Sequence, residues 1–373
     1  MTATLTDQDR PHLVRALGLA EGGRGRVSPN PLVGAVLVRD GQVVGEGFHA
    51  AIGERHAEVA ALEDCRSRSQ NPAGATLYVT LEPCAHEGRQ PPCTDAIVAA
   101  GIARVVIGCD DPSEKASGRG PGTLRDEGID VAFAEGADAA AARLLIQPFR
   151  KHARTGRPLV THKAAISLDG RTATGAGDSK WISGPESRRL VHEWRAESDA
   201  IAVGIGTALA DDPLLTARDV DAASQPTRVV FDSGARLPLD SRLVRSLDEA
   251  PVVAVCGPDA SGDRVAALRD AGVEVISVAG AGAAGVTAAL EELGRRGLTS
   301  LMLEGGATLG GAFLEAGAID GMRVFVAPVI LGDGRPLFAG PGAAAVGEAT
   351  RPLSSSSERI GEDVLIDARL REW

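Results

Sequence analysis

The stretch Thr80-Leu81-Glu82-Pro83-Cys84-Ala85-His86-Glu87-Gly88-Arg89-Gln90-Pro91-Pro92-Cys93 decides the fold of the first half of the chain. The apolar run at 75–81 predicts a buried strand that ends just before the first cysteine, and residues 94–100 predict a helix that begins just after the second. Another motif, His56-Ala57-Glu58, opens a predicted helix. We expect these element ends to bring the histidine and both cysteines together.

His56, Cys84 and Cys93 carry the nitrogen and sulfur donors that zinc prefers in tetrahedral sites. Three protein ligands leave the fourth position to a water molecule, whose pKa zinc lowers to about 7. Glu58 follows His56 by two residues, close enough to exchange protons with that water without binding the metal. The order His-x-Glu, then Pro-Cys, then a second cysteine is the pattern of zinc deaminases. We therefore predict a zinc-dependent deaminase site with Glu58 as its catalytic acid and base.

The two cysteines have eight residues between them, whereas nucleoside deaminases have two. This insertion carries His86 and Arg89, which we expect to lie over the metal pocket, where a cation would suit a phosphorylated substrate. A closed structural zinc site is the alternative interpretation. It needs a fourth protein ligand, which His86 could provide, but Glu58 would then have no task.

Strand and helix patterns alternate through the rest of the first half. Residues 11–21 predict an amphipathic helix. The apolar runs 32–38 and 42–47 flank Asp40-Gly41, a hairpin signal because both residues tolerate positive φ. A further strand is predicted at 103–108. This alternation predicts an α/β domain with helices packed on a sheet.

A basic polar stretch separates the two halves of the chain. We expect residues 1–149 and 158–373 to form separate domains joined by a linker at 150–157. Strands are expected in the second domain at 159–163, 200–203, 228–231, 252–256, 273–278, 301–304 and 323–330, with helices between several of them. The second domain is therefore predicted to be α/β as well.

Three local patterns in the second domain carry expectations of their own. Ser183-Gly184-Pro185-Glu186 has the form of a capping box and predicts the start of a helix. The Ala/Gly tract at 279–284 and the serine run at 354–357 are expected to be loops.

Composition disfavours several classes of protein. Lys+Arg 39 against Asp+Glu 50 gives a formal net charge of −11, and 3% of residues are aromatic, so broad nucleic-acid binding is disfavoured. No segment approaches the roughly 18 uninterrupted apolar residues of a membrane helix, and the start of the chain shows no secretory pattern. We therefore expect a cytoplasmic protein with a small-molecule substrate, and neither nucleic acid nor membrane as a partner.

Short motifs occur along nearly the whole chain. The first half carries Ser28-Pro29-Asn30-Pro31-Leu32-Val33-Gly34, Gly47-Phe48-His49, His56-Ala57-Glu58-Val59, Thr80-Leu81-Glu82-Pro83-Cys84 and Pro91-Pro92-Cys93. The second half carries Ser167-Leu168-Asp169-Gly170-Arg171, Asp178-Ser179-Lys180-Trp181-Ile182, Val203-Gly204-Ile205-Gly206-Thr207, Leu209-Ala210-Asp211-Asp212-Pro213 and Glu304-Gly305-Gly306. In these motifs the chain resembles the bifunctional riboflavin-biosynthesis deaminase/reductase family.

The resemblance implies a cytidine-deaminase-like zinc domain followed by a dihydrofolate-reductase-like domain that uses NADPH. It also implies two consecutive reactions. First, 2,5-diamino-6-ribosylamino-4(3H)-pyrimidinone 5′-phosphate loses its C2 amino group as ammonia. Then the ribosyl group is reduced to ribityl, which gives 5-amino-6-ribitylamino-uracil 5′-phosphate. Hydride from NADPH would add to the imine that forms at C1′ when the ribosylamine ring opens.

The resemblance also assigns site residues. It implies that Asn30, His49, His86 and Arg89 bind the pyrimidine, while Ser28 stands where we expect a histidine. It implies substrate contacts in the second domain by Ser179, Arg195, Leu215, Arg218 and Glu304. It implies NADPH contacts by Ala165, Trp181, Thr207, Asp211, Ser233, Gly306, Ala307, Thr308, Leu309, Gly310 and Gly311, and Lys163 is a further polar candidate. The two guanidinium groups would suit a ribose phosphate through bidentate contacts, and the glycine-rich turn would admit pyrophosphate to backbone N–H groups.

Three alternative interpretations are open. They are a nucleoside or RNA deaminase with a non-catalytic second domain, a zinc-stabilised protein without catalysis, and an active deaminase joined to a degenerate reductase. The net charge, the scarce aromatic residues and the long insertion oppose the first. Replacing Glu58 by Gln separates the second, because a structural site would lose nothing. We also expect a homo-oligomer, whose size the sequence leaves open, as it does the preference for NADPH over NADH.

Overall fold

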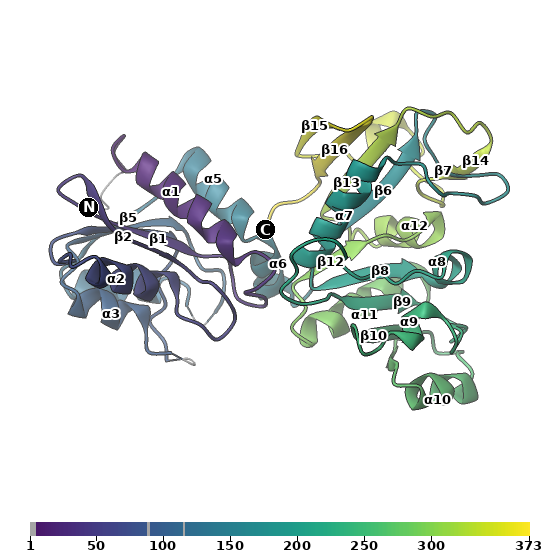
Figure 1. Ribbon diagram of the computed structural model, residues 1–373, viewed down its shortest axis with the longest axis horizontal. Helices are drawn as coiled ribbons and strands as arrows, with labels where there is room; N and C mark the ends of the chain where they lie inside the picture. Colours follow the sequence, from purple (N-terminus) through teal and green to yellow (C-terminus); the bar gives the residue numbers. More distant parts are fainter. Residues whose placement is uncertain (1–4, 88–89, 115) are drawn as a thin grey trace. The chain divides into compact units, whose positions relative to one another are not determined.

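The computed structural model describes residues 5–87, 90–114 and 116–373 and divides the chain into two compact units (Figure 1). The first unit comprises the chain up to Thr155 together with Trp373, and the second comprises Gly156–Glu372. Most of the stretch expected as a linker, 150–157, is helical, since α6 covers Gln147–Thr155. The helix buries Arg150, whose guanidinium donates to the carboxylate of Asp110, so this basic stretch is not simply solvated.

The first unit is built on a five-stranded sheet with the strand order β2-β1-β3-β4-β5. The strands are β1 (Gly34–Arg39), β2 (Gln42–Phe48), β3 (Thr76–Leu81), β4 (Arg104–Cys109) and β5 (Asp130–Phe133). β1 runs antiparallel to β2 and β3, whereas β3, β4 and β5 are parallel. The predicted hairpin is confirmed, since Asp40 and Gly41 between β1 and β2 have φ angles of 51° and 74°.

Helices cover both faces of this sheet (Figure 1). α1 (Arg10–Ala20) and α5 (Gly136–Leu145) lie on one face, α2 (Ala57–Ser67) and α3 (Cys93–Ala99) on the other, and α4 (Arg119–Asp126) packs beside α3. α2 approaches β2 closely because Gly45 and Gly47 have no side chains. A Cβ at Gly47 would lie 2.4 Å from the amide nitrogen of Ala61. This packing fixes the start of α2, where His56 and Glu58 lie.

The second unit is built on a nine-stranded sheet with the order β11-β10-β9-β8-β12-β6-β13-β16-β15. The strands are β6 (Leu159–Ser167), β8 (Ala200–Gly204), β9 (Thr227–Phe231), β10 (Val252–Cys256), β11 (Glu274–Ser277), β12 (Ser300–Leu303), β13 (Gly321–Ala327), β15 (Ser354–Ile360) and β16 (Asp363–Arg369). The strands from β11 to β13 in this order are parallel, and β16 and β15 add an antiparallel hairpin at one edge. The seven expected strands are confirmed, with bounds that differ by a few residues.

Helices and a small ribbon complete the second unit. The helices are α7 (Pro185–Glu197), α8 (Ile205–Asp211), α9 (Arg242–Arg245), α10 (Gly262–Asp270), α11 (Gly282–Arg295) and α12 (Ala307–Glu315). β7 (Arg171–Thr174) and β14 (Gly334–Pro336) pair as a two-stranded ribbon. Short 3₁₀ turns lie at Glu21–Gly23 in the first unit and Val346–Glu348 in the second.

Two loop expectations in the second unit were wrong, one of them in part. The serine run at 354–357 belongs to β15, which pairs with β16 along its length, because ladder hydrogen bonds hold an exposed edge strand without apolar side chains. The tract at 279–284 is a loop only as far as Ala281. α11 begins at Gly282 because the alanines that follow favour helix.

The helix predicted after Ser183 is confirmed as α7, but its first turn is capped differently. The N-cap residue is Gly184, and no capping-box side chain closes the turn. Instead Asp363 Oδ2, at the start of β16, accepts hydrogen bonds from the Gly184 N–H at 2.8 Å and from the Ser187 hydroxyl at 2.5 Å. A carboxylate distant in the sequence therefore replaces the local pattern.

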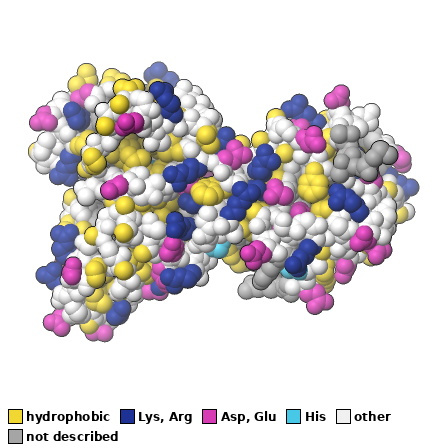
Figure 2. Space-filling model, turned by 180° about the vertical axis from the view of Figure 1, so that it is seen from behind, with side chains coloured by type: hydrophobic (Ala, Val, Ile, Leu, Met, Phe, Trp, Pro, Cys, Tyr) yellow, Lys and Arg dark blue, Asp and Glu magenta, His cyan; other side chains and the backbone are white. Residues whose placement is uncertain are grey.

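The surface carries charges of both signs. Figure 2 shows Lys and Arg side chains interspersed with Asp and Glu over the face in view. Among the helices of the described residues, none is long and apolar enough to cross a lipid bilayer.

Candidate active sites in the two units

A cluster of metal-binding donors lies beyond the carboxyl end of β3 in the first unit. His56 is the N-cap of α2, Cys84 follows β3, and Cys93 is the first residue of α3. His56 Nδ1 lies 3.2 Å from Cys93 Sγ and 3.6 Å from Cys84 Sγ, and the donor atoms all lie within 4.8 Å of one another. The structure therefore brings together the three side chains that the sequence singled out.

The composition of this cluster fits zinc. One imidazole nitrogen and two thiol sulfurs form a usual zinc donor set, and the cluster in the described residues holds three such donors, which leaves room for a water ligand. A hydrogen bond from the Cys93 thiol lowers the pKa of the Cys84 thiol to about 4, with further help from His56 and against the effect of burial. This favours the thiolate form, which is the form that binds metal.

Glu58 lies beside the cluster without belonging to it. It sits in the first turn of α2 and is 4% exposed. Burial raises the pKa of its carboxyl to about 7, and the neighbouring Cys84 sulfur adds to this rise. A carboxyl in this position can accept and release a proton near neutral pH.

Asn30 and His49 form a hydrogen-bonded chain near the cluster. Asn30 Nδ2 lies 3.1 Å from His49 Nε2, and His49 Nδ1 lies 3.0 Å from the carbonyl oxygen of Arg55. Because a carbonyl only accepts, His49 carries its hydrogen on Nδ1 and accepts from the Asn30 amide at Nε2. Burial lowers the pKa of His49, which keeps the ring neutral. The chain thereby orients the Asn30 amide, and the His49 ring centroid lies 5.7 Å from that of His56.

The insertion between the cysteines is anchored at its far end. Gln90 Nε2 donates to the carbonyl oxygens of Glu54 at 2.7 Å and Gly53 at 3.3 Å. His86 is half-buried, and its Nδ1 is buried without a hydrogen-bond partner in the described structure. His86 lies outside the donor cluster, so the described residues form no four-ligand site. Arg89, predicted to bind substrate, lies outside the described residues.

A buried ion pair forms the centre of the second site. Glu304 follows β12 and accepts two hydrogen bonds from Arg195 of α7, with Nε to Oε1 at 2.7 Å and Nη2 to Oε2 at 2.9 Å. Burial opposes ionisation of Glu304, but Arg195 lowers the pKa of its carboxyl to about 2. Lys163 of β6 faces the same pair, and burial lowers the pKa of its ammonium group, against the effect of Glu304.

The loop after α8 brings two predicted substrate residues, Leu215 and Arg218, to this site. Arg195 Nη1 donates to the carbonyl oxygen of Thr216 at 3.2 Å, and Arg218 Nη1 donates to the Thr216 hydroxyl at 3.1 Å. Arg195 thus uses three of its five N–H groups within the protein, which leaves two for a ligand.

His192 is the residue of this site that sequence reasoning missed. The backbone N–H of Arg218 donates to His192 Nδ1 at 3.1 Å. The available signal was the position of His192 on α7, three residues before Arg195, which places both side chains on one helix face.

The glycine-rich turn after β12 is shaped to receive a ligand at the start of α12. Gly306 is the N-cap, and no side chain caps the helix, so its first N–H groups are available to an anion. Gly311 lets the chain fold back, since a Cβ there would lie 1.8 Å from the carbonyl oxygen of Ala339. Thr207 lies beside the turn, with its hydroxyl 3.7 Å from where a Gly306 Cβ would stand.

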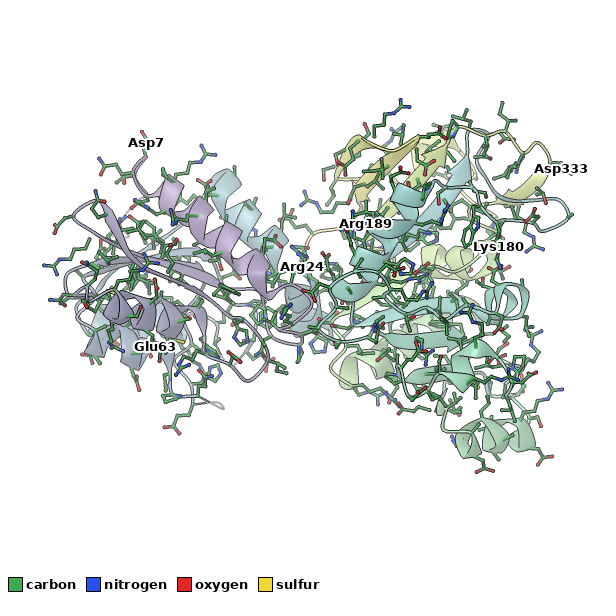
Figure 3. All side chains as sticks on the ribbon, viewed as in Figure 1. Asp7, Arg24, Glu63, Lys180, Arg189 and Asp333 are labelled. Carbon is green, nitrogen blue, oxygen red and sulfur yellow. The ribbon has the colours of Figure 1, made fainter. Side chains whose placement is uncertain are left out.

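The other predicted reductase residues are more widely spread. Trp181 is 70% exposed, and the Arg188 guanidinium lies 4.8 Å from its ring centroid. The neighbouring Lys180, labelled in Figure 3, forms an ion pair with Asp211 at the end of α8. Its Nζ lies 3.7 Å from Asp211 Oδ1. Ser179 is half-buried just before it, and Ala165 is partly buried in β6. Ser233 is exposed after β9, and β8 lies between that strand and β12, so Ser233 stands apart from the Glu304 cluster.

A three-donor metal cluster with a buried glutamate on a layered α/β sheet defines the class of zinc deaminases, here joined to a second α/β unit. Residues 6–109 match the family described as the cytidine and deoxycytidylate deaminase zinc-binding region, and residues 158–366 match the RibD C-terminal domain. The riboflavin biosynthesis protein RibD of Actinobacillus pleuropneumoniae is 39% identical over 98% of this chain and 95% of its own. That of Escherichia coli strain K12 is 40% identical over 96% of this chain and 98% of its own.

Solved structures agree with the sequence relatives. RibD of Acinetobacter baumannii has a TM-score of 0.86 at 36% identity, covering 98% of this chain and 99% of that one. The Thermotoga maritima diaminohydroxyphosphoribosylaminopyrimidine deaminase/5-amino-6-(5-phosphoribosylamino)uracil reductase has a TM-score of 0.84 at 35% identity, with the same coverage. The chain belongs to the RibD family of riboflavin-biosynthesis proteins.

Membership confirms the predicted fold class and the predicted double activity. The chain is a bifunctional enzyme of riboflavin biosynthesis, with a cytidine-deaminase-like domain and a RibD C-terminal reductase domain. Its cofactors are zinc for the deaminase and NADPH for the reductase, and its substrate is a small pyrimidine.

Proposed function

We propose that this chain catalyses two consecutive steps on one phosphorylated pyrimidine. The first is the hydrolytic deamination of 2,5-diamino-6-ribosylamino-4(3H)-pyrimidinone 5′-phosphate. The second is the NADPH-dependent reduction of the ribosyl group, which gives 5-amino-6-ribitylamino-uracil 5′-phosphate. One observation carries the proposal: a His56-Cys84-Cys93 cluster and a buried Arg195–Glu304 pair occur in one chain, and the Thermotoga maritima deaminase/reductase covers 98% of it.

In the deaminase site, His56, Cys84 and Cys93 would hold zinc, which supplies the Lewis acidity that activates a water molecule. Glu58 takes a proton from that water and delivers it to the C2 amino group, which leaves as ammonia. The oxygen of the water stays on C2, so the atoms balance. The buried carboxyl of Glu58, in the same helix turn as His56, suits this short transfer.

Asn30, His49, His86 and Arg89 are the proposed pyrimidine-binding residues. The hydrogen bonds from Asn30 to His49 and from His49 to Arg55 support this role, because they hold the Asn30 amide in one orientation. The unpartnered Nδ1 of His86 supports it as well. A buried polar atom without a hydrogen bond costs about 1–3 kcal/mol, which a polar group of the substrate would offset.

In the reductase site, the ribosylamine ring would open to an imine at C1′, and bound NADPH would supply the hydride for this carbon. The imine nitrogen must gain a proton. Lys163 is the group we assign to this transfer, because it faces the Arg195–Glu304 pair and its pKa is lowered by burial. Ser179, Leu215 and Glu304 are assigned to the ribose chain.

Arg218 and Arg195 are the proposed phosphate-binding residues. The side chain of Arg218 is exposed and makes one hydrogen bond to Thr216, so most of its N–H groups are free for a ligand. Arg195 contributes less than the sequence suggested, because Glu304 neutralises its charge.

We assign NADPH binding to the glycine-rich turn and the residues around it. The N–H groups at the start of α12 would receive the pyrophosphate. The assigned residues are Ala165, Trp181, Thr207, Asp211, Ser233, Gly306, Ala307, Thr308, Leu309, Gly310 and Gly311.

We further propose that the chain forms a homo-oligomer and acts in the cytoplasm, with neither nucleic acid nor membrane as a partner. Val364 and Ile366, on one face of β16, are 40% and 38% exposed, and Leu353 just before β15 is 62% exposed. Apolar side chains gathered at the edge of a sheet favour burial against a second copy of the same hairpin.

A coupled assay tests the proposed function. Zinc-loaded protein is supplied with the diaminopyrimidinone ribosyl phosphate, and ammonia release and NADPH oxidation are followed separately. Both signals are expected, with ammonia first. Ammonia without NADPH oxidation would indicate a degenerate reductase, and RNA or cytidine as the better ammonia source would indicate a nucleoside or RNA deaminase. Neither signal from folded, zinc-loaded protein would refute the proposed substrate.

A further inference from the structure

We propose that His192 is a positioning residue that holds Arg218 in place for the phosphate of the reductase substrate. This inference rests on the proposed function, which assigns the phosphate to Arg218. It concerns a residue that touches neither the reacting carbon nor the cofactor in our proposal.

His192 shares one face of α7 with Arg195. His192 and Arg195 are three residues apart on α7, so both side chains point toward the loop after α8. Arg195 reaches the carbonyl oxygen of Thr216 at 3.2 Å, and His192 reaches the backbone N–H of Arg218 at 3.1 Å. Side chains of α7 therefore form hydrogen bonds to the loop at Thr216 and at Arg218.

The loop after α8 contains a backbone conformation that other side chains must stabilise. Leu215 has a φ of 58°, in the left-handed region that costs an L-residue roughly 1–2 kcal/mol. Arg228 of β9 and Gln225 at the far end of the loop hold this conformation. Arg228, fully buried, donates to the carbonyl oxygen of Leu214 at 3.3 Å, and the Gln225 amide bonds both backbone groups of Ala217 at 2.8 and 2.9 Å. His192 holds the residue that follows, Arg218 itself.

The contact between His192 and Arg218 requires a neutral imidazole. The Arg218 N–H donates to His192 Nδ1, so this nitrogen is unprotonated and the neutral ring carries its hydrogen on Nε2. Burial lowers the pKa of His192, and the guanidinium groups of Arg195 and Arg218 lower it further, while Thr216 and Glu304 act in the opposite sense. The neutral ring is the form that can accept from Arg218.

The contact with His192 affects how Arg218 would bind the substrate phosphate. With its backbone fixed by His192 and one N–H bonded to the Thr216 hydroxyl, the Arg218 guanidinium keeps a defined position at the surface of the site. A pre-positioned cation binds an anion more tightly because less side-chain and loop freedom is lost on binding. Removing the acceptor should therefore weaken phosphate binding rather than hydride transfer.

The test compares substrates with and without the phosphate. Using the full-length enzyme and the deaminated ribosylaminouracil, we expect His192→Leu to raise KM for the phosphorylated substrate about tenfold, the effect of losing one hydrogen bond. We expect kcat and NADPH affinity to stay within about twofold. With the dephosphorylated substrate, His192→Leu and the unchanged protein should give the same KM.

Conservative and control variants complete the design. Asn can place an amide oxygen near the position of Nδ1, so His192→Asn should restore most of the affinity, whereas His192→Gln should not. His192→Gln also serves as the variant without a correctly placed acceptor if His192→Leu fails to fold. Arg189→Ala, on the same helix at an exposed position labelled in Figure 3, should leave all constants unchanged.

Different results would overturn the proposal or its foundation. An equal loss with both substrates, a loss confined to kcat, or no rescue by Asn would refute the positioning role of His192. The variant Arg218→Ala distinguishes a failure of the phosphate assignment from a failure of the His192 proposal. If that variant does not impair binding of the phosphorylated substrate, the phosphate assignment itself is wrong. If it does and His192→Leu has no effect, the assignment stands and His192 has no part in it.

Discussion

At the scale of one residue, the proposed deaminase site assigns proton transfer and metal binding to different side chains. The carboxyl of Glu58 is buried in the first turn of α2, while the donor atoms belong to His56, Cys84 and Cys93. We expect Glu58→Gln to lower ammonia release by about 10²–10⁴-fold, the usual contribution of general acid–base transfer. Zinc content and NADPH oxidation with the deaminated substrate should not change. Metal analysis and both assays on one preparation measure this.

Glu63→Gln is the matched control for this prediction. Glu63, labelled in Figure 3, lies on the same helix, and its carboxylate pairs with Arg55 at 2.7 Å on the surface. That variant should keep full ammonia release. Wild-type turnover in Glu58→Gln, or a loss of zinc together with activity, would contradict the role given to Glu58.

At this scale, predictability followed the distance over which a contact acts. The grouping of His56, Cys84 and Cys93 could be predicted because each lies in a short motif at the end of a strand or the start of a helix. The contact between His192 and Arg218 could not be predicted, since the two residues are 26 positions apart and only the folded loop brings them together. The pairing of Arg195 with Glu304, across 109 residues, was hidden for the same reason, although both residues had been singled out.

At the scale of one element, the first turn of α7 is capped by a residue of β16. Asp363 accepts hydrogen bonds from Gly184 and Ser187, so it performs the capping that the sequence attributed to Ser183. We expect Asp363→Ala to destabilise the second unit by about 1–2 kcal/mol, the usual loss on removing a cap, and Ser183→Ala to have little effect. Denaturant unfolding followed by loss of NADPH oxidation measures both. Equal losses in the two variants would favour the local capping box.

An acid-sensitive network ties α1 to the sheet of the first unit. Asp9, just before α1, accepts hydrogen bonds from Tyr78 Oη at 2.8 Å and from Arg104 at 2.6 and 3.0 Å. Although burial opposes ionisation, the hydrogen bonds from Arg104, Thr6 and Tyr78 hold the pKa of the Asp9 carboxyl well below its usual range. Protonation of Asp9 therefore weakens the attachment of α1.

The sign of the pH effect follows from this depressed pKa. The unfolded value is about 3.9, so the stabilisation is fully present above about pH 5 and is lost as pH falls toward the folded pKa. We expect Asp9→Asn to cost about 3 kcal/mol at pH 7, since it leaves Arg104 without its buried partner, and to cost progressively less below pH 4. Denaturant unfolding of both proteins across this range measures the difference. A difference independent of pH would contradict the assignment.

Elements with strong local patterns were predictable, and elements that depend on tertiary contacts were not. The buried strands carry continuous runs of Val, Ile and Leu, which mark them in the sequence. α4 contains two glycines and a proline, so its propensity is poor. It forms because Gly120 lets it approach the segment after β3, where a Cβ at this position would lie 1.9 Å from the carbonyl oxygen of Pro83. The serines of β15 likewise form a strand because β16 is there to pair with them.

At the scale of the whole molecule, charge and exposed apolar surface act in opposite directions. Each chain carries −11, which repels a second copy at low ionic strength. The apolar face of β16 favours association, and salt screens the repulsion without weakening apolar contact. The proposed homo-oligomer should therefore be stabilised, not dissociated, by moderate salt.

Charge placed on either face of the hairpin tests this balance. Ile366→Glu puts a carboxylate on the exposed apolar face of β16, where burial against a second copy would be costly, so we expect dissociation to the monomer. Ser356→Glu is the control, because it adds the same charge on the neighbouring strand but on the other face of the hairpin. Ser356 pairs with Asp367, whereas Ile366 pairs with Ser357. This variant should leave the assembly intact. Sedimentation velocity over a range of concentrations distinguishes these outcomes. A wild-type monomer, or an assembly that both variants leave unchanged, would show that this face is not the contact between copies.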